Sequence, residues 1–162
     1  MKKLICFVAL AFMMTININA QRKMAALFKE MPDSILSVLT KNNRLDMIDF
    51  MDAKMKAQVT NLLDGKSEMT MLADDSLKIK MSDVMSVKMM VVDTKEEYDS
   101  CKQVVCMIST YTIPSTGDYE SIVNYYSVKW HPLENPNLLV PLAPVPTSFK
   151  HDEKVMSTKP VY

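Results

Sequence analysis

The feature that most limits the fold of this chain is a change in the spacing of its apolar residues at Gly65. Before this glycine, apolar residues recur three or four positions apart, as on one face of an amphipathic helix. After it they alternate with polar residues, which is typical of half-buried strands. Helices followed by strands predict an α+β protein, because an α/β protein would alternate the two.

Three helical segments are expected before Gly65. The first covers residues 24–29, and the second begins at Pro32, which suits the first turn of a helix. The third covers residues 44–63 and ends at Asp64 and Gly65, where glycine takes the left-handed conformation at little cost. The third helix carries one continuous apolar stripe: Met47, Ile48, Met51, Met55 and Val59.

The second half predicts an antiparallel β-meander of about five strands, on which the N-terminal helices pack. Short turns imply antiparallel neighbours, because a parallel crossover needs about a dozen residues or more. Pro114 to Asp118 is a strong hairpin signal, and the polar run 94–100 is expected to be another turn. From His131 onward prolines favour irregular structure, with at most a short edge strand at 138–140. The expected strands cover residues 68–73, 77–81, 85–91, 104–113 and 122–130.

The first twenty residues are typical of a secretory signal peptide. Lys2 and Lys3 precede an apolar run at 4–14 that is too short to span a bilayer, and Ala20 supplies a small residue for cleavage. Cys6 lies inside this leader, so no lipid anchor is expected, and the protein is expected in the periplasm or outside the cell. The expected organisation is a signal peptide at 1–20, one α+β domain at 21–149 and a flexible C-terminal tail at 150–162.

The charge balance argues against a nucleic-acid partner, and the hydropathy argues against a membrane span after the leader. Without Lys2 and Lys3 the 19 basic residues become 17, against 19 acidic residues, which leaves a net charge of about −2. No nucleic-acid partner is expected, because nucleic acid requires a basic surface. No membrane span is expected after the leader, because no later apolar run is long enough.

Cys101 and Cys106 are the cysteines that follow the leader. On one extended strand their Cα atoms would be about 16 Å apart, which is too far for a disulfide. Unpaired thiols that behave as small apolar residues are therefore expected. A bridge stays open as an alternative if Cys101 lies in the preceding turn, or if one cysteine pairs with another chain.

Methionine is the compositional outlier, with 16 residues in the chain. Thioethers suit Cu(I), and Met47, Met51 and Met55 share one helix face. The same spacing is typical of a core stripe in which methionine is an adaptable filler. We prefer the core interpretation because neither histidine is near this helix, and we expect no metal and no cofactor.

Asp46, Asp49 and Asp52 recur at three-residue steps on the third expected helix. Paired carboxylates can perform acid–base chemistry or bind a hard cation. Exposed acids flanked by Arg44 and Lys54 more often form a solvated, ion-paired surface, which is the preferred interpretation.

Signatures of nucleophilic catalysis are missing. A Ser/His/Asp arrangement would need His131 or His151. The chain contains no Gly-x-Ser-x-Gly motif and no glycine-rich phosphate loop. No catalytic residue is therefore assigned.

Four aromatic residues of the second half are candidate contact residues for a partner: Tyr111, Tyr125, Tyr126 and Trp130. Tyr125 and Tyr126 are adjacent on an expected strand, so their side chains must leave opposite faces of the sheet. An exposed aromatic group on a sheet often marks a contact surface for a protein or sugar. Ordinary core packing is the preferred alternative.

The chain also contains a set of short motifs: Met31–Ser34, Asn42–Phe50, Met55–Ala57, Val59–Asn61, Ser67–Thr70, Val105–Met107 and Tyr126–Trp130. These motifs resemble a family of exported proteins from anaerobes that is known only as a domain of unknown function. The resemblance covers most of the chain after the leader, and its first third is specific. It implies export and a single domain, and it brings no activity, ligand or catalytic residue.

Because catalytic motifs are missing, we expect a non-catalytic exported module that binds an unknown protein or a small ligand of the cell envelope. The alternative is a cell-envelope hydrolase that uses Asp46 or Asp49 with a histidine. A pocket larger than about 300 Å³ would favour the hydrolase if two or more of Asp46, Asp49, Asp52 and His131 line it.

Overall fold

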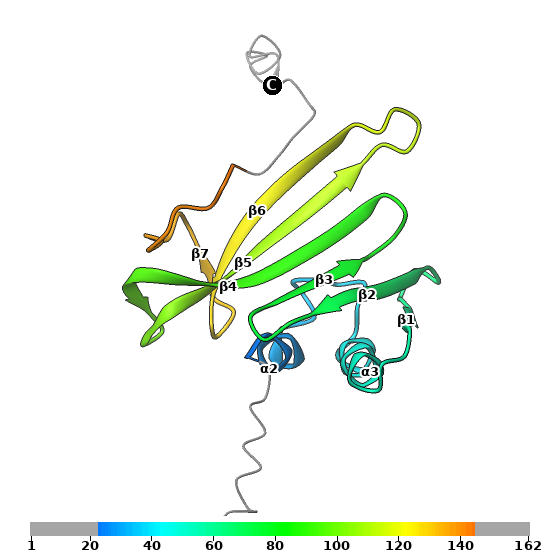
Figure 1. The fold of residues 1–162 in the computed structure, drawn as a ribbon, viewed down its shortest axis with the longest axis horizontal. Helices are drawn as coiled ribbons and strands as arrows, with labels where there is room; N and C mark the ends of the chain where they lie inside the picture. Colours follow the sequence, from blue (N-terminus) through cyan, green and yellow to red (C-terminus); the bar gives the residue numbers. More distant parts are fainter. Residues whose placement is uncertain (1–22, 145–162) are drawn as a thin grey trace, which may run out of the picture.

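The computed structural model describes residues 23–144, which form two α-helices and a seven-stranded antiparallel sheet (Figure 1). Helices α2 (Lys23–Glu30) and α3 (Lys41–Asp52) lie on the same side of the sheet. The strands follow one another in sequence order, so the sheet is a meander as predicted. They are β1 (Ala57–Thr60), β2 (Lys66–Leu72), β3 (Ser76–Lys80), β4 (Met85–Tyr98), β5 (Cys101–Thr112), β6 (Tyr119–Ser127) and β7 (Pro132–Leu133). The expected signal peptide at 1–20 and tail at 150–162 lie outside the described residues.

The prediction of about five strands was wrong, because two short strands lie in segments that were assigned otherwise. Strands β2 to β6 correspond to the five expected strands. β7 lies in the proline-punctuated segment, and β1 lies inside the segment 44–63 that was expected to be one helix. α3 ends at Asp52, and Lys54 takes a left-handed conformation (φ 56°) that redirects the chain.

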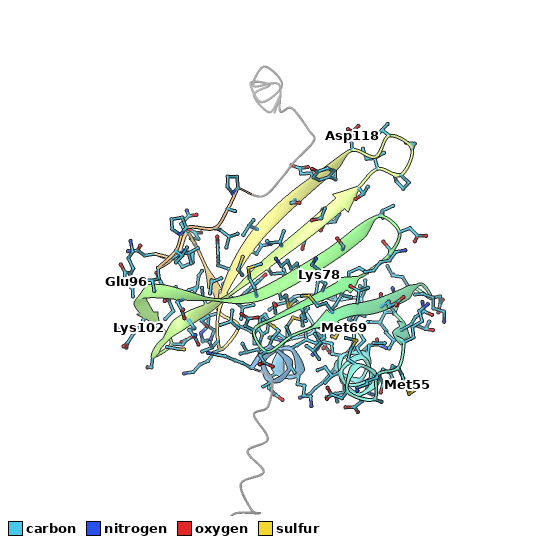
Figure 2. All side chains as sticks on the ribbon, viewed as in Figure 1. Met55, Met69, Lys78, Glu96, Lys102 and Asp118 are labelled. Carbon is cyan, nitrogen blue, oxygen red and sulfur yellow. The ribbon has the colours of Figure 1, made fainter. Side chains whose placement is uncertain are left out.

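Apolar spacing could not separate the two parts of the segment 44–63. Val59 lies four positions after Met55, which suits a helix stripe, and two positions after Ala57, which suits one face of a strand. Both are buried on β1, which pairs with β2. Met55, which was expected in the stripe, is 60% exposed and lies on the outside of the molecule (Figure 2). β1 therefore depends on pairing with its neighbour rather than on local propensity.

Two smaller expectations before β2 were also wrong. The segment after Pro32 forms successive turns instead of a helix, in which the Leu39 N–H donates to the Leu36 carbonyl (2.9 Å). Leu36 and Leu39 still point into the core. Asp64, and not Gly65, takes the left-handed conformation (φ 56°), in the turn between β1 and β2.

Arg44 holds the helical layer together from the inside. Its side chain is 1% exposed, on the first turn of α3. Its guanidinium group donates to the backbone carbonyl oxygens of Phe28 (3.1 Å), Met31 (2.5 Å) and Leu39 (2.9 Å). It also donates to Asp33 Oδ1 (2.7 Å), whose side chain is 62% exposed. One side chain thus joins α2, the turns after Pro32 and α3.

Methionine fills the core between the helices and the sheet, as the preferred interpretation predicted. Met69, for example, is 2% exposed and lies between the sheet and the helices (Figure 2). Seven methionines among residues 23–144 are buried: Met24, Met31, Met47, Met69, Met81, Met89 and Met107. Flexible thioether side chains can fill the irregular space between a twisted sheet and two short helices.

The prediction of a turn at 94–100 was wrong, because β4 continues to Tyr98. The turn itself is Asp99 and Ser100, both left-handed (φ 51° and 62°), which is typical of a two-residue hairpin. Thr94, which is 3% exposed, bridges to Leu138, so the expected edge strand at 138–140 is an isolated bridge. A two-stranded extension beyond the core needs no apolar alternation, and its sequence therefore resembles a turn.

Candidate functional site

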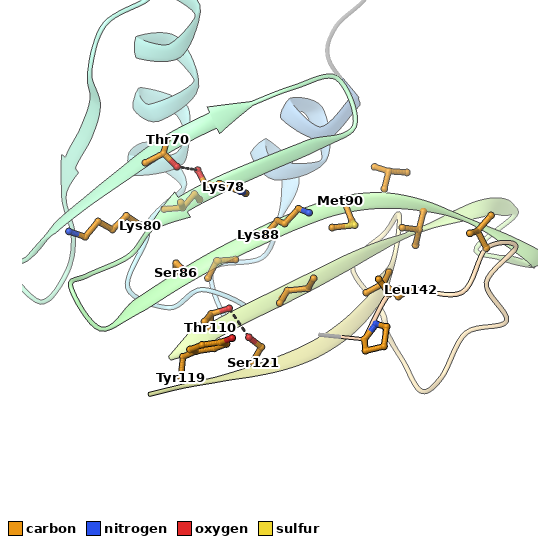
Figure 3. Close-up of a pocket in the computed structure, with 18 of the residues that line it drawn as sticks. Thr70, Lys78, Lys80, Ser86, Lys88, Met90, Thr110, Tyr119, Ser121 and Leu142 are labelled. Atoms are coloured by element: carbon orange, nitrogen blue, oxygen red, sulfur yellow. Dashed lines mark hydrogen bonds between the residues drawn. The ribbon is translucent and has the colours of Figure 1, made fainter. Parts of the chain in front are cut away.

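The face of the sheet opposite the helices carries a groove of about 840 Å³ (Figure 3). Successive strand residues point to opposite faces, so the groove is lined by residues that alternate with core residues on β3, β4 and β5. Residues 140–144 border one end. They follow the bridge between Leu138 and Thr94, and the Leu139 N–H donates to the Asp93 carbonyl (2.9 Å). Strand pairing therefore holds the floor of the groove in place, and the bridge to Thr94 anchors the segment that borders its end.

The groove has an apolar floor and a cationic side. Met90, Val92 and Ile108 form part of the floor, and Leu142 comes from the segment after the bridge. Figure 3 shows Lys80 and Leu142 toward opposite ends. Basic side chains come from two neighbouring strands: Lys78, Lys80 and Lys88. Hydroxyl groups come from Thr110 of β5 and from Tyr119 and Ser121 of β6. The Thr110 and Ser121 hydroxyls are hydrogen-bonded to each other (2.9 Å).

Two of the groove lysines directly face each other. Lys78 of β3 and Lys88 of β4 are partners in the antiparallel register. Among residues 23–144 neither has a carboxylate partner, whereas Lys80 pairs with Asp83 (2.7 Å). Asp93 also lines the groove, but its carboxylate accepts from Gln103 (2.7 Å). Like charges directly opposite each other are unfavourable in a sheet, and an anion bound between these two lysines would interact with both.

The sequence analysis did not select these lysines. The usable signal was the alternation of Lys78 and Lys80 with Leu77 and Ile79, which places both lysines on one face. Alternation alone places them at the polar positions of a half-buried strand, and it does not show that helices cover only the other side.

The predicted acidic residues lie elsewhere. Asp46, Asp49 and Asp52 are exposed on α3. His131 lies at the turn after β6 and contacts Asp99, and His151 lies outside the described residues. None of the four residues named for a hydrolase pocket lines the groove. The described part of the chain contains no group of three or more His, Cys, Asp and Glu residues that could hold a metal ion.

The four aromatic candidates are divided between the core and the surface. Trp130 is 6% exposed, its ring lies 5.8 Å from that of Tyr126, and its Nε1–H donates to the Leu27 carbonyl (3.1 Å). Tyr125 lies on the opposite face from Tyr126, as the register with β5 requires. Burial raises the pKa of both tyrosines. Tyr111 is 44% exposed, and none of the four lines the groove.

A cluster that the sequence analysis missed joins two hairpin turns. The Ser127 hydroxyl donates to Asp99 Oδ2, and His131 Nδ1 lies 2.8 Å from the same oxygen. Ser127 Oγ also accepts from the backbone N–H groups of Lys129 and His131, each at 3.2 Å. The residue types match a catalytic triad, but the carboxylate occupies the central place that histidine must take to activate serine. The arrangement ties the β4–β5 turn to the β6–β7 turn.

This cluster predicts a specific dependence of stability on pH. The Ser127 hydroxyl, opposed by partial burial and aided by His131, holds the pKa of Asp99 below its usual value. A lowered folded-state pKa gives stability that is present above about pH 4 and is lost as pH falls through the folded pKa. Asp99→Asn is therefore expected to lower the urea midpoint at pH 7, and the difference from the parent should shrink as pH falls toward 3.

The matched variant is Ser127→Ala, which removes the largest cause of the lowered Asp99 pKa. In the Ser127→Ala background, Asp99→Asn should lower the urea midpoint at pH 7 by less than it does in the parent. Urea titrations followed by circular dichroism at several pH values measure it. A difference between the parent and Asp99→Asn that is constant from pH 7 to pH 3 would show that the carboxylate is not held in its charged form.

Both cysteines of the described chain are free thiols. They lie on β5, as the prediction of unpaired cysteines assumed. Cys106 is 0% exposed, and burial raises the pKa of its thiol to about 11, against a weaker opposite effect of Lys88. It is therefore protonated near neutral pH and acts as a small apolar residue.

No curated protein matches the chain. A solved structure titled as a domain of an uncharacterized protein from Porphyromonas gingivalis W83 is similar, with a TM-score of 0.56 and 24% sequence identity. The match covers 70% of this chain and 54% of that chain, so this chain spans about half of its solved relative, and the likeness concerns the fold alone.

Two further findings concern the helices and the family of the chain. Among residues 23–144, neither helix has the length and apolar character needed to cross a membrane. The family model described as "Protein of unknown function (DUF3256)" matches residues 15–159, which is most of the sequence. The chain therefore belongs to the DUF3256 family of proteins of unknown function.

Proposed function

We propose that this protein is an exported, non-catalytic binding module whose ligand occupies the groove on the open face of the sheet. The observation that supports it is the groove itself, which has about 840 Å³ of space and apolar residues on its floor. Small-molecule sites usually have about 300–1,000 Å³ and predominantly apolar walls. Export is proposed from the charged and apolar leader at residues 1–20.

The groove is better suited to binding than to catalysis. Its charged groups are three lysines and Asp93, and the described lining holds no histidine or cysteine. The Ser127 hydroxyl lies outside the groove, is 1% exposed and is already bound to Asp99. The Thr110 and Ser121 hydroxyls bond to each other (2.9 Å) and the Thr70 hydroxyl bonds to the Lys78 carbonyl, so neither of these contacts pairs a nucleophile with a base.

Nile red, a neutral dye that fluoresces in apolar surroundings, tests the proposal. The intact protein should bind it in a saturable manner. Ile108→Asn introduces an amide on the groove floor and should weaken binding at least about five-fold, because an apolar contact becomes an unpaired polar group.

Ile122→Asn is the matched control, because Ile122 lies on the neighbouring strand β6, is 48% exposed and does not line the groove. It should leave binding unchanged, and circular dichroism should confirm that both variants are folded. Equal binding by the parent and Ile108→Asn would reject the groove as the site.

A further inference from the structure

We infer that the ligand of the groove is an amphipathic anion with a single apolar chain, whose negative head group lies between Lys78 and Lys88. This inference rests on the proposed function, since it assigns a ligand class to the same groove. It is argued from the register of β3 and β4, from the charges that line the groove and from the order of residues along β4.

The first argument is the unpaired charge. Lys78 and Lys88 are directly opposite in the register, and among the described residues neither has an acidic partner. Directly opposite residues in an antiparallel pair have Cβ atoms about 5 Å apart, so a carboxylate or similar group can contact both ammonium groups. An anion bound there would be attracted by both charges.

The second argument is the order of residues along β4. Lys88, Met90 and Val92 alternate with core residues and therefore follow one another on the groove face. Four residues of extended chain span about 13 Å, so the cationic group and the far end of the apolar floor are separated by roughly that distance. The groove thus matches a molecule with a charged head and an extended apolar chain. Leu142, which lies toward the end away from Lys80, adds a further apolar side chain to the lining (Figure 3).

The third argument excludes an extended peptide or a sugar chain as the favoured ligand. β3, β4 and β5 are internal strands where they form the floor, so their backbone groups are occupied by the neighbouring strands. A peptide normally binds a sheet at an edge, through backbone hydrogen bonds. On the apolar part of the floor, which includes Met90, Val92 and Ile108, the donors and acceptors of a peptide or sugar would find no side-chain partner, which is costly.

Dodecanoate and dodecanol form the test pair, because they share one apolar chain and differ in the charged head. Dodecanoate is titrated below its micelle concentration, and dodecanol below its solubility limit, against the complex of the intact protein with Nile red. Dodecanoate is expected to displace the dye at about five-fold or more lower concentration than dodecanol, and 0.5 M salt should remove most of this advantage.

The double variant Lys78→Gln/Lys88→Gln should lose the preference for dodecanoate and still bind dodecanol and Nile red. The matched control is Lys95→Gln/Lys102→Gln, which changes two exposed lysines on the β4–β5 extension that do not line the groove. Figure 2 shows Lys102 far from Lys78. This control should retain the preference.

The outcomes separate the two proposals. Equal displacement by dodecanol and dodecanoate, or an unchanged preference in Lys78→Gln/Lys88→Gln, overturns the anionic ligand and leaves the binding groove standing. No binding of any probe rejects both. Two other occupants of the groove would also overturn the inference. A second copy of the chain would be detected in sedimentation as a dimer that Ile108→Asn dissociates. Residues 145–162 would be detected if the probes bind only after these residues are removed.

Discussion

Replacing Arg44 by alanine is expected to cost about 3–5 kcal/mol of unfolding free energy, the largest effect of any substitution proposed for this protein. The buried guanidinium group satisfies three backbone carbonyl oxygens, those of Phe28, Met31 and Leu39. Each orphaned carbonyl costs about 1 kcal/mol or more, and the side chain leaves a cavity. Since whole domains are stable by only about 5–15 kcal/mol, the variant should unfold at much lower urea concentration.

Two controls separate this network from ordinary surface charge. Lys41→Ala removes an exposed cation of the same helix that lies 3.6 Å from Glu30, and should cost less than about 1 kcal/mol. Asp33→Asn keeps an oxygen acceptor but removes the carboxylate that pairs with the buried Arg44, so it should cost more than Lys41→Ala and clearly less than Arg44→Ala. Urea unfolding followed by circular dichroism measures all three. A loss below about 1 kcal/mol for Arg44→Ala would refute its role as the anchor of the helical layer.

Trp130→Ala is expected to cost about 3–5 kcal/mol, which is in the same range as Arg44→Ala. The indole ring is 6% exposed, packs on Tyr126 and donates from Nε1 to the Leu27 carbonyl, which joins the β6–β7 turn to α2. Removing it leaves a large cavity and an unpaired carbonyl. Trp130→Phe keeps most of the packing and loses only the donor, so it should cost roughly 1–2 kcal/mol.

The appropriate control is Tyr111→Ala, because Tyr111 is an aromatic residue of the same sheet that is 44% exposed. It should cost less than about 1 kcal/mol. The same urea titrations measure the series. Equal losses for Trp130→Phe and Trp130→Ala would mean that the hydrogen bond, and not burial of the ring, dominates. Equal losses for Trp130→Ala and Tyr111→Ala would contradict the placement of Trp130 in the core.

The burial of Arg44 and the pairing of the groove lysines could not be predicted from the sequence. The pattern of residues 44–52 placed Met47 and Ile48 correctly in the core, because helical spacing is a local property. It could not reveal that Arg44, on the same helix, is buried, because the carbonyl groups that bind it come from α2 and the following turns. Lys78 and Lys88 were visible as strand residues, yet their pairing depends on the register of two strands.

The sequence by itself determined the order of helices before strands, the five main strands and the role of methionine as core filler. These follow from the period of apolar residues, which each segment carries locally. Only the tertiary structure decided that Ala57–Thr60 is a strand, that Arg44 is internal and that one face of the sheet is left open as a groove. Each of these depends on which distant segments lie side by side, and spacing along the chain contains no such information.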